Sequence, residues 1–204
     1  MSIRKGGEWG EPGRLAPGSA VASSDRELAE LIGGFMEAGA VPPPIGLSGG
    51  DLHASIGSPP PERMWTDEAR VLPIDVVEVR LDDGEPILCV GHVVAGGPLR
   101  WLTETLVVMN ATSLDGQNLG PKAHPGDGLV DVTHGRVPLG DWFTARRRAG
   151  AGAHLPHPGL RTSRVSELDV VLGQRLAVRI DGLVRGRATR VRCRVLADAA
   201  SIVA

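Results

Sequence analysis

Hydrophobic spacing predicts one helix near the start of the chain. Within segment 24–38, apolar residues recur at the spacing of a single helix face: Leu28, Leu31, Ile32, Phe35 and Met36. Ser24 and Glu27 form a capping box ahead of this face, and Gly39 is the expected stop. We therefore expect an amphipathic helix that packs one side against a core.

Two short apolar runs flank this helix, one at 20–23 and one at the start of 45–57, and each predicts a short strand. A Gly-Gly turn follows the second run and leads into a second short helix that starts near Asp51. Residues 1–61 thus predict a small, reduced α/β fragment with too few strands for a doubly wound sheet.

From about residue 71 onwards the pattern changes to that of β-strands. Segment 189–196 is the clearest case, with Val191, Cys193 and Val195 on one face and Arg190, Arg192 and Arg194 on the other. Further strands are predicted at 74–81, 86–94, 104–111, 128–133, 165–172 and 175–181. One helix is predicted, at 140–150. So many short strands joined by turns predict a mainly β domain over 71–204, an antiparallel β-sandwich or barrel.

Composition fits this expectation. Aromatic residues make up 3% of the 204 residues and tyrosine is absent, so Val, Leu, Ile and Ala must build the core, which favours strands. The formal net charge of -2 provides no global field for a nucleic acid, and we expect no nucleic-acid partner. Cys89 and Cys193 lie in apolar runs without metal-ligand spacing, so we expect buried, reduced thiols. No apolar stretch reaches the roughly 18 residues of a spanning helix, and a cytoplasmic protein is expected.

The segment 124–132, His-Pro-Gly-Asp-Gly-Leu-Val-Asp-Val, has two interpretations. Gly126 and Gly128 would supply the backbone freedom of a tight turn, with Asp127 bonded to its own backbone. Alternatively, the Asp127 carboxylate orders a site. The segment by itself does not decide between them.

Three weak elements gain weight from their order along the chain: the Gly-Gly turn at 48–57, the Asp-Gly-Leu turn at 127–129 and the Ile-Asp-Gly turn at 180–182. Together they resemble the diacylglycerol kinase superfamily, which includes bacterial lipid kinases and sphingosine kinases. Segments 73–79, 104–116, 152–162 and 179–182 also resemble motifs of its C-terminal domain. The resemblance implies a β-sandwich of the lipid-kinase C-terminal type behind a truncated ATP-binding domain.

The resemblance also implies two sites in the sandwich. A structural metal, commonly Mg²⁺, would be held by the Asp127 carboxylate and the main-chain carbonyls of His124 and Leu129. Gly126 stands where the family has a further acid. Asp181 matches the family's catalytic turn as the base that takes the proton from a lipid hydroxyl, but Leu183 stands where the family has a glutamate.

The nucleotide site departs further from the family. Where active members carry Gly-Gly-Asp-Gly-Thr, residues 23–27 read Ser-Ser-Asp-Arg-Glu, so only Asp25 matches and Glu27 would repel a phosphate. The shortened second motif leaves Gly49, Gly50 and Asp51 as the other candidates for binding ATP.

Other features have ordinary structural explanations. The arginines of 189–196 would bind an anionic headgroup or form a solvated sheet face. The segment 141–148 sets Trp142 and Phe143 beside three arginines, which indicates either membrane-surface contact or packing on the sandwich. His154 and His157 lie in a Pro-rich loop, a poor frame for zinc.

Three functions follow as hypotheses. The first is a non-catalytic lipid-kinase homologue that binds a lipid, a small molecule or a protein partner, with peripheral membrane contact as one form. The second is an active kinase that moves the γ-phosphate of ATP to a lipid hydroxyl, with Mg²⁺ and with Asp181 as base. The third is a structural protein whose exposed sheet edge pairs with another chain, as in a homo-oligomer.

Overall fold

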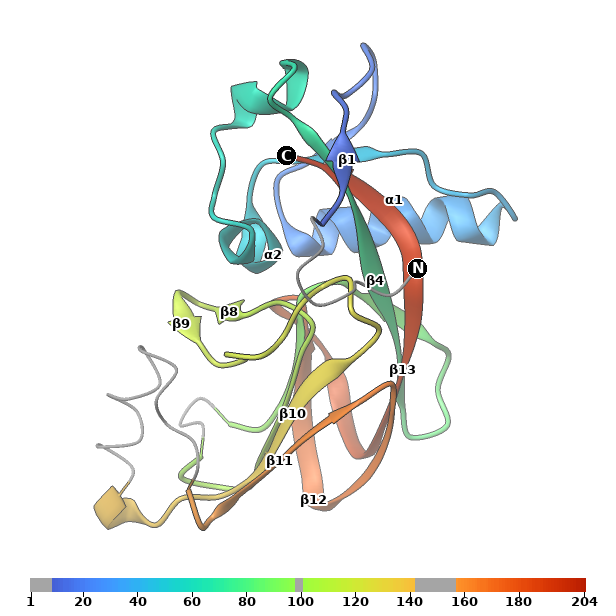
Figure 1. Ribbon diagram of the computed structural model, residues 1–204. Coiled ribbons are helices and arrows are strands. Elements are labelled where there is room, and N and C mark those ends of the chain that lie inside the picture. Colours follow the sequence, from blue (N-terminus) through green and yellow to red (C-terminus); the bar gives the residue numbers. More distant parts are fainter. Residues whose placement is uncertain (1–8, 98–100, 142–156) are drawn as a thin grey trace.

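A computed structural model describes residues 9–97, 101–141 and 157–204 (Figure 1). Strands dominate it, as predicted. The strands are β1 Glu11–Pro12, β2 Val21–Ala22, β3 Ile45–Leu47, β4 Arg70–Leu81, β5 Ile87–Cys89, β6 His92–Ala95, β7 Thr105–Met109, β8 Ser113–Leu114, β9 Gln117–Asn118, β10 Val130–Gly135, β11 Leu160–Val165, β12 Glu167–Ile180 and β13 Leu183–Val203. The helices are α1 Asp25–Glu37, α2 Gly50–Ser55 and the 3-10 turn η1 Pro61–Trp65.

One large sheet organises the molecule, in the order β1-β4-β13-β12-β6-β7-β10-β11. The paired neighbours along this path are antiparallel, which confirms a mainly β fold with a large antiparallel sheet. The predicted strands 165–172 and 175–181 are a single strand, β12, with an irregularity between Val171 and Leu176. The predicted helix at 140–150, which includes Trp142 and Phe143, lies almost wholly outside the described residues, and so does His154.

The sheet also joins the two halves of the chain. β13 and β4 run from the sandwich up to the helices (Figure 1). At its upper end β13 pairs in parallel with β3, placing Ile202 opposite Ile45, and β3 pairs with β2. The division into 1–61 and 71–204 stays a prediction, but the strands of the N-terminal fragment belong to the same sheet as the sandwich.

Helix α1 forms as its apolar spacing predicts. The Ser24 side chain caps it, and Leu28, Ala29 and Ile32 are buried against the sheet. The helix ends at Glu37, and Gly39 follows with a φ of +68°, a conformation that favours glycine.

Among the described residues, two large apolar clusters and two smaller ones form the core. Inside the sandwich, side chains of β4, β5, β6, β7, β10, β12 and β13 form one core, including Val79, Cys89 and Cys193. Both cysteines are buried free thiols, as expected. A second cluster joins α1, α2 and β3 to the upper ends of β4 and β13. The space between the two clusters contains the polar residues described next.

Candidate functional site

Three predicted site residues, Asp25, Asp51 and Asp181, lie together where α1, α2 and two turns of the sheet meet. Sequence reasoning missed a fourth member, His92. Ligand-capable atoms of Asp25, His92 and Asp181 all lie within 4.8 Å of one another. The only sequence signal for His92 was its polarity within the apolar run 86–94.

Asp181 occupies the turn between β12 and β13 and has a φ of +46°. Its Oδ2 accepts a hydrogen bond from the Val90 amide at 2.9 Å, and its Oδ1 accepts bonds from the amides of Gly91 and His92, also at 2.9 Å. The Cys89 thiol lies 3.3 Å from the same Oδ1. The carboxylate therefore organises the chain between β5 and β6, and this is why the predicted strand 86–94 divides at Gly91.

Leu183, two positions after Asp181, offers no acid–base chemistry. Leu183, where the resemblance would place a glutamate, is 37% exposed at the start of β13. No second carboxylate extends from this turn toward an incoming hydroxyl, because residues 181–183 read Asp-Gly-Leu.

Asp25 is the first residue of α1 and is 4% exposed. Its carboxylate accepts hydrogen bonds from the Asp51 amide at 2.9 Å and the Leu52 amide at 3.1 Å, so it caps the N-terminus of α2. Burial raises the pKa of Asp25 to about 7, and the charge of Asp181 adds to the effect. Asp25 thus bonds the backbone groups that an anionic ligand would need.

The Gly-Gly pair serves this same contact. A Cβ on Gly50, whose φ is +95°, would collide with the Asp25 carboxylate, and one on Gly49 would collide with the Ser23 carbonyl. The two glycines therefore let the start of α2 approach the start of α1. The chain's own backbone and carboxylate fill the space next to them, and their predicted role in binding phosphate stays a prediction.

Glu27 closes the N-terminus of α1. Its Oε2 accepts bonds from the Ser23 amide and the Ser23 hydroxyl, each at 2.8 Å, while the Ser24 hydroxyl accepts from the Glu27 amide at 3.3 Å. The Ser23 amide, followed by its hydroxyl, holds the pKa of Glu27 below its ordinary value. A fixed negative charge therefore lies beside the N-terminus of α1.

Asp51 ties the cluster to the sandwich. Its Oδ1 accepts a bond from the Ser113 hydroxyl at 3.2 Å, and its Oδ2 lies 3.5 Å from Nδ1 of His92. The cluster consists of three carboxylates and one imidazole, a set of donors able to hold a divalent cation.

The predicted metal loop contains a cation of its own. Oδ1 of Asp127 accepts a bond from the Leu129 amide at 3.1 Å, and Oδ2 contacts the guanidinium of Arg164, a residue that sequence reasoning missed. Arg164 also lies 2.8 Å from Asp131, its direct partner across the β10–β11 ladder. The His124 carbonyl accepts the Asp127 amide at 3.4 Å. These residues therefore do not fit a divalent ion well, because the acidic oxygen that would bind it already contacts a guanidinium.

The same loop depends on a buried acid that the sequence did not reveal. Asp75 is fully buried, and its carboxylate accepts bonds from the amides of Gly128 at 2.6 Å and Asp198 at 3.0 Å. Burial raises the pKa of Asp75 to about 6. A side chain at Gly126 would collide with Trp9 Nε1 and the Pro73 carbonyl, which explains why no second acid occurs there.

The arginine stripe of β13 is paired on the surface. Arg190 contacts Asp169 at 2.5 Å and Arg192 contacts Asp83 at 3.2 Å. Arg194 lies 3.9 Å from Glu167. This arrangement favours a solvated sheet face over a headgroup site.

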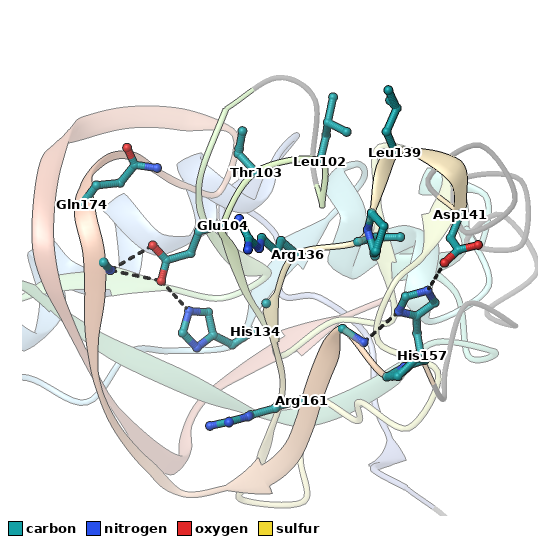
Figure 2. Close-up of a pocket in the computed structure, with 16 residues that line it drawn as sticks. Leu102, Thr103, Glu104, His134, Arg136, Leu139, Asp141, His157, Arg161 and Gln174 are labelled. Atoms are coloured by element: carbon teal, nitrogen blue, oxygen red, sulfur yellow. Dashed lines mark hydrogen bonds and ion pairs between the residues drawn. The ribbon is translucent and has the colours of Figure 1, made fainter.

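A cavity of about 1230 Å³ lies at the end of the sandwich where β7 begins and β10 ends (Figure 2). Its lining includes Glu104, His134, Arg136 and Arg161. None of these residues was singled out by the sequence.

Comparison with known proteins identifies the fold. No family model and no curated protein matches the sequence. A crystal structure of a diacylglycerol kinase from Bacillus anthracis strain Sterne superposes with a TM-score of 0.68 at 14% identity, covering 89% of this chain and 74% of that one. Two further structures of this kind from the same organism give TM-scores of 0.66 and 0.65 at 12% and 11% identity, covering 89% and 88% of this chain and 76% and 75% of those. The chain therefore has the diacylglycerol kinase fold, and no helix among its described residues is long and apolar enough to span a membrane.

Proposed function

We propose that this chain, built on the diacylglycerol kinase fold, is a non-catalytic lipid-kinase homologue that acts as a lipid- or partner-binding module. One observation carries the proposal. Two carboxylates of the chain itself lie at the positions where nucleotide phosphates would be bound: Glu27 accepts bonds from Ser23 just before α1, and Asp25 caps the N-terminus of α2.

Electrostatics opposes ATP at these positions. A phosphate placed beside the exposed Glu27 would be repelled by its carboxylate. Arg26, the nearest cation in sequence, lies 3.9 Å from Glu30 instead. Nucleotide binding would also require the helix amides to exchange well-aligned internal bonds for bonds to phosphate.

The catalytic turn supports the same conclusion. The carboxylate of Asp181 accepts three amide bonds and faces a thiol, and Leu183 provides no second acid. Loss of a general base typically costs about 10²–10⁴ in rate. A chain with this turn and with carboxylates at both helix N-termini is better suited to binding than to phosphoryl transfer.

The polar cluster favours a second candidate, an active lipid kinase. Asp25, His92 and Asp181 come close enough to share a cation. The pKa of Asp25, at about 7, also falls in the range suited to a general base at neutral pH. In this alternative the cluster would hold Mg²⁺ with ATP, and Asp25 or Asp181 would accept the proton of a lipid hydroxyl.

Calorimetric titration with Mg-ATP, followed by a phosphotransfer assay with radiolabelled ATP and diacylglycerol, separates the two candidates. We expect no heat and no labelled lipid. Glu27→Gln removes the repelling charge and keeps a hydrogen-bonding side chain, so a gain of ATP binding in this variant alone would support the proposal. Micromolar binding by the unmodified chain, abolished in Asp25→Asn, would establish the kinase candidate instead.

A further inference from the structure

We infer that the cavity at the far end of the sandwich binds a phosphate-bearing amphiphile through Arg136 and Arg161. This site depends on the proposed role of the chain as a binding module and specifies the ligand class. The cavity lies at the opposite end of the sandwich from α1 and α2, so its occupation would not involve the Asp25 cluster (Figures 1 and 2).

The strand register brings the cationic groups together. Arg161 of β11 lies directly opposite His134 of β10, and facing residues in an antiparallel pair place their side chains on the same face. Arg136 follows two residues later, where its amide donates to the Gly159 carbonyl at 3.1 Å. Two guanidinium groups and one imidazole thus line the same cavity from adjacent strand ends.

The cavity's acids have partners of their own. Oε1 of Glu104 lies 3.0 Å from Nε2 of His134, and both Glu104 oxygens accept from the Gly173 amide at 2.9–3.1 Å. Oδ2 of Asp141 lies 3.8 Å from Nε2 of His157. His157 keeps its ring oriented, since its Nδ1 accepts the Gly159 amide at 3.0 Å.

The two arginines differ from these acids in their ion pairing. Over residues 9–97, 101–141 and 157–204, neither Arg136 nor Arg161 forms an ion pair, and both are exposed. The arginines of β11 and β13 that lie outside the cavity mostly have carboxylate partners, as Arg164 and Arg190 do. A guanidinium presents a planar fork that fits phosphate bidentately.

Two leucines at the rim of the cavity indicate that the ligand also has an apolar part. Leu102 and Leu139 point to the same side of the cavity, away from Arg161 (Figure 2). Leu139 is 64% exposed. An anionic head held by the arginines would place an attached apolar chain on these leucines, so an amphiphile gains more than a bare anion.

Flotation of the full chain with phosphatidylcholine vesicles, with and without phosphatidic acid, tests this site. We expect binding that requires phosphatidic acid and that weakens about ten- to a hundredfold in Arg136→Gln/Arg161→Gln. Arg14→Gln/Arg26→Gln changes the net charge equally on the N-terminal fragment and should bind normally. Leu139→Ser should weaken vesicle binding while leaving folding, monitored by circular dichroism, unchanged.

Titration with short-chain phosphatidic acid and with inorganic phosphate identifies the source of the anion. Binding of the lipid alone supports the amphiphile, whereas equal affinity for inorganic phosphate overturns it. The site is overturned if the cavity double variant and the Arg14/Arg26 control lose vesicle binding equally, or if no probe binds at all. ATP titrated into the same preparations tests the non-catalytic role independently of the lipid site. If the chain binds ATP and still binds the lipid, only the non-catalytic role is overturned.

Discussion

Nε of Arg164 lies 2.8 Å from Oδ1 of Asp131, its cross-strand partner, and the same guanidinium reaches Asp127 in the preceding turn. A single side chain therefore joins β11 to the loop that the family resemblance assigns to a metal. Arginine suits this task because its fork contacts two carboxylates at once.

Stability should accordingly be independent of Mg²⁺. We expect the same melting temperature in magnesium chloride and in EDTA. Arg164→Gln should lower the free energy of unfolding by about 1–2 kcal/mol, since its charge-assisted bonds are partly exposed to solvent. Arg164→Lys should recover only part of this loss, because an ammonium cannot bridge both acids. A Mg²⁺-dependent rise in the unmodified chain that disappears in Asp127→Asn would show that a metal is bound there after all.

Asp25 should make the chain less stable as pH rises toward neutrality. Its pKa is raised in the folded state from 3.8 to about 7, with Asp181, Asp51 and His92 around it. Between these values the folded chain keeps a proton that the unfolded chain has released, so the free energy of unfolding falls as pH rises. The total is at most about 4 kcal/mol, at roughly 1.4 kcal/mol per pH unit.

Urea unfolding from pH 4 to 8 measures this dependence. Asp25→Asn should flatten the slope, leaving the smaller contribution of Asp75, whose pKa is raised to about 6. Asp67→Asn, at a side chain that is 96% exposed, should retain the full slope. An unchanged slope in Asp25→Asn would rule out Asp25 as its source.

Gly50 and Gly57 form a matched pair for testing the contact between the helices. Both have φ near +95°, but a Cβ on Gly50 collides with Asp25, whereas one on Gly57 meets nothing within 4 Å. Gly57→Ala should cost only the conformational strain, about 1–2 kcal/mol. Gly50→Ala should cost at least about 2 kcal/mol more, measured by urea unfolding. Equal losses would mean that α2 moves away from Asp25 at little cost.

Asn110 should contribute strongly to the junction between sandwich and site. Its buried Nδ2 donates to the carbonyls of Asp75 at 3.0 Å and Val90 at 2.8 Å. Asn110→Ala leaves both acceptors without this donor, and we expect a loss of about 2–4 kcal/mol in the free energy of unfolding. Thr112→Ala, at a half-buried neighbour, should cost much less, and a similar loss in both variants would contradict this role of the Asn110 amide.

Local signals predicted the local structure. The capping box and the apolar spacing sufficed to place α1, because both depend on residues within four positions of each other. Apolar runs between turns indicated β4, β7 and β10, and alternation indicated the middle of β13. Segment 86–94 was wrongly predicted as a single strand, because its break is imposed by Asp181, about ninety positions later in the chain.

The candidate site was likewise predictable only in part. Family resemblance selected Asp25, Asp51 and Asp181, and the fold brings them together. It also indicated that Glu27 would repel a phosphate, but not that the Glu27 carboxylate binds both the amide and the hydroxyl of Ser23. Nor did it indicate Arg164, whose contact with Asp131 depends on strand register. Such contacts join residues that are distant in sequence, and no periodicity within one segment encodes them.

The parallel pairing of β13 with β3 has a consequence for the order of folding during synthesis. Ile45 and Gly46 find their partners at Ile202 and Val203. While the ribosome is still elongating the chain, β3 has no strand to pair with on that side, and α1 has only part of the surface on which it packs. On that side β3 must therefore wait for residues that are made more than 150 positions later.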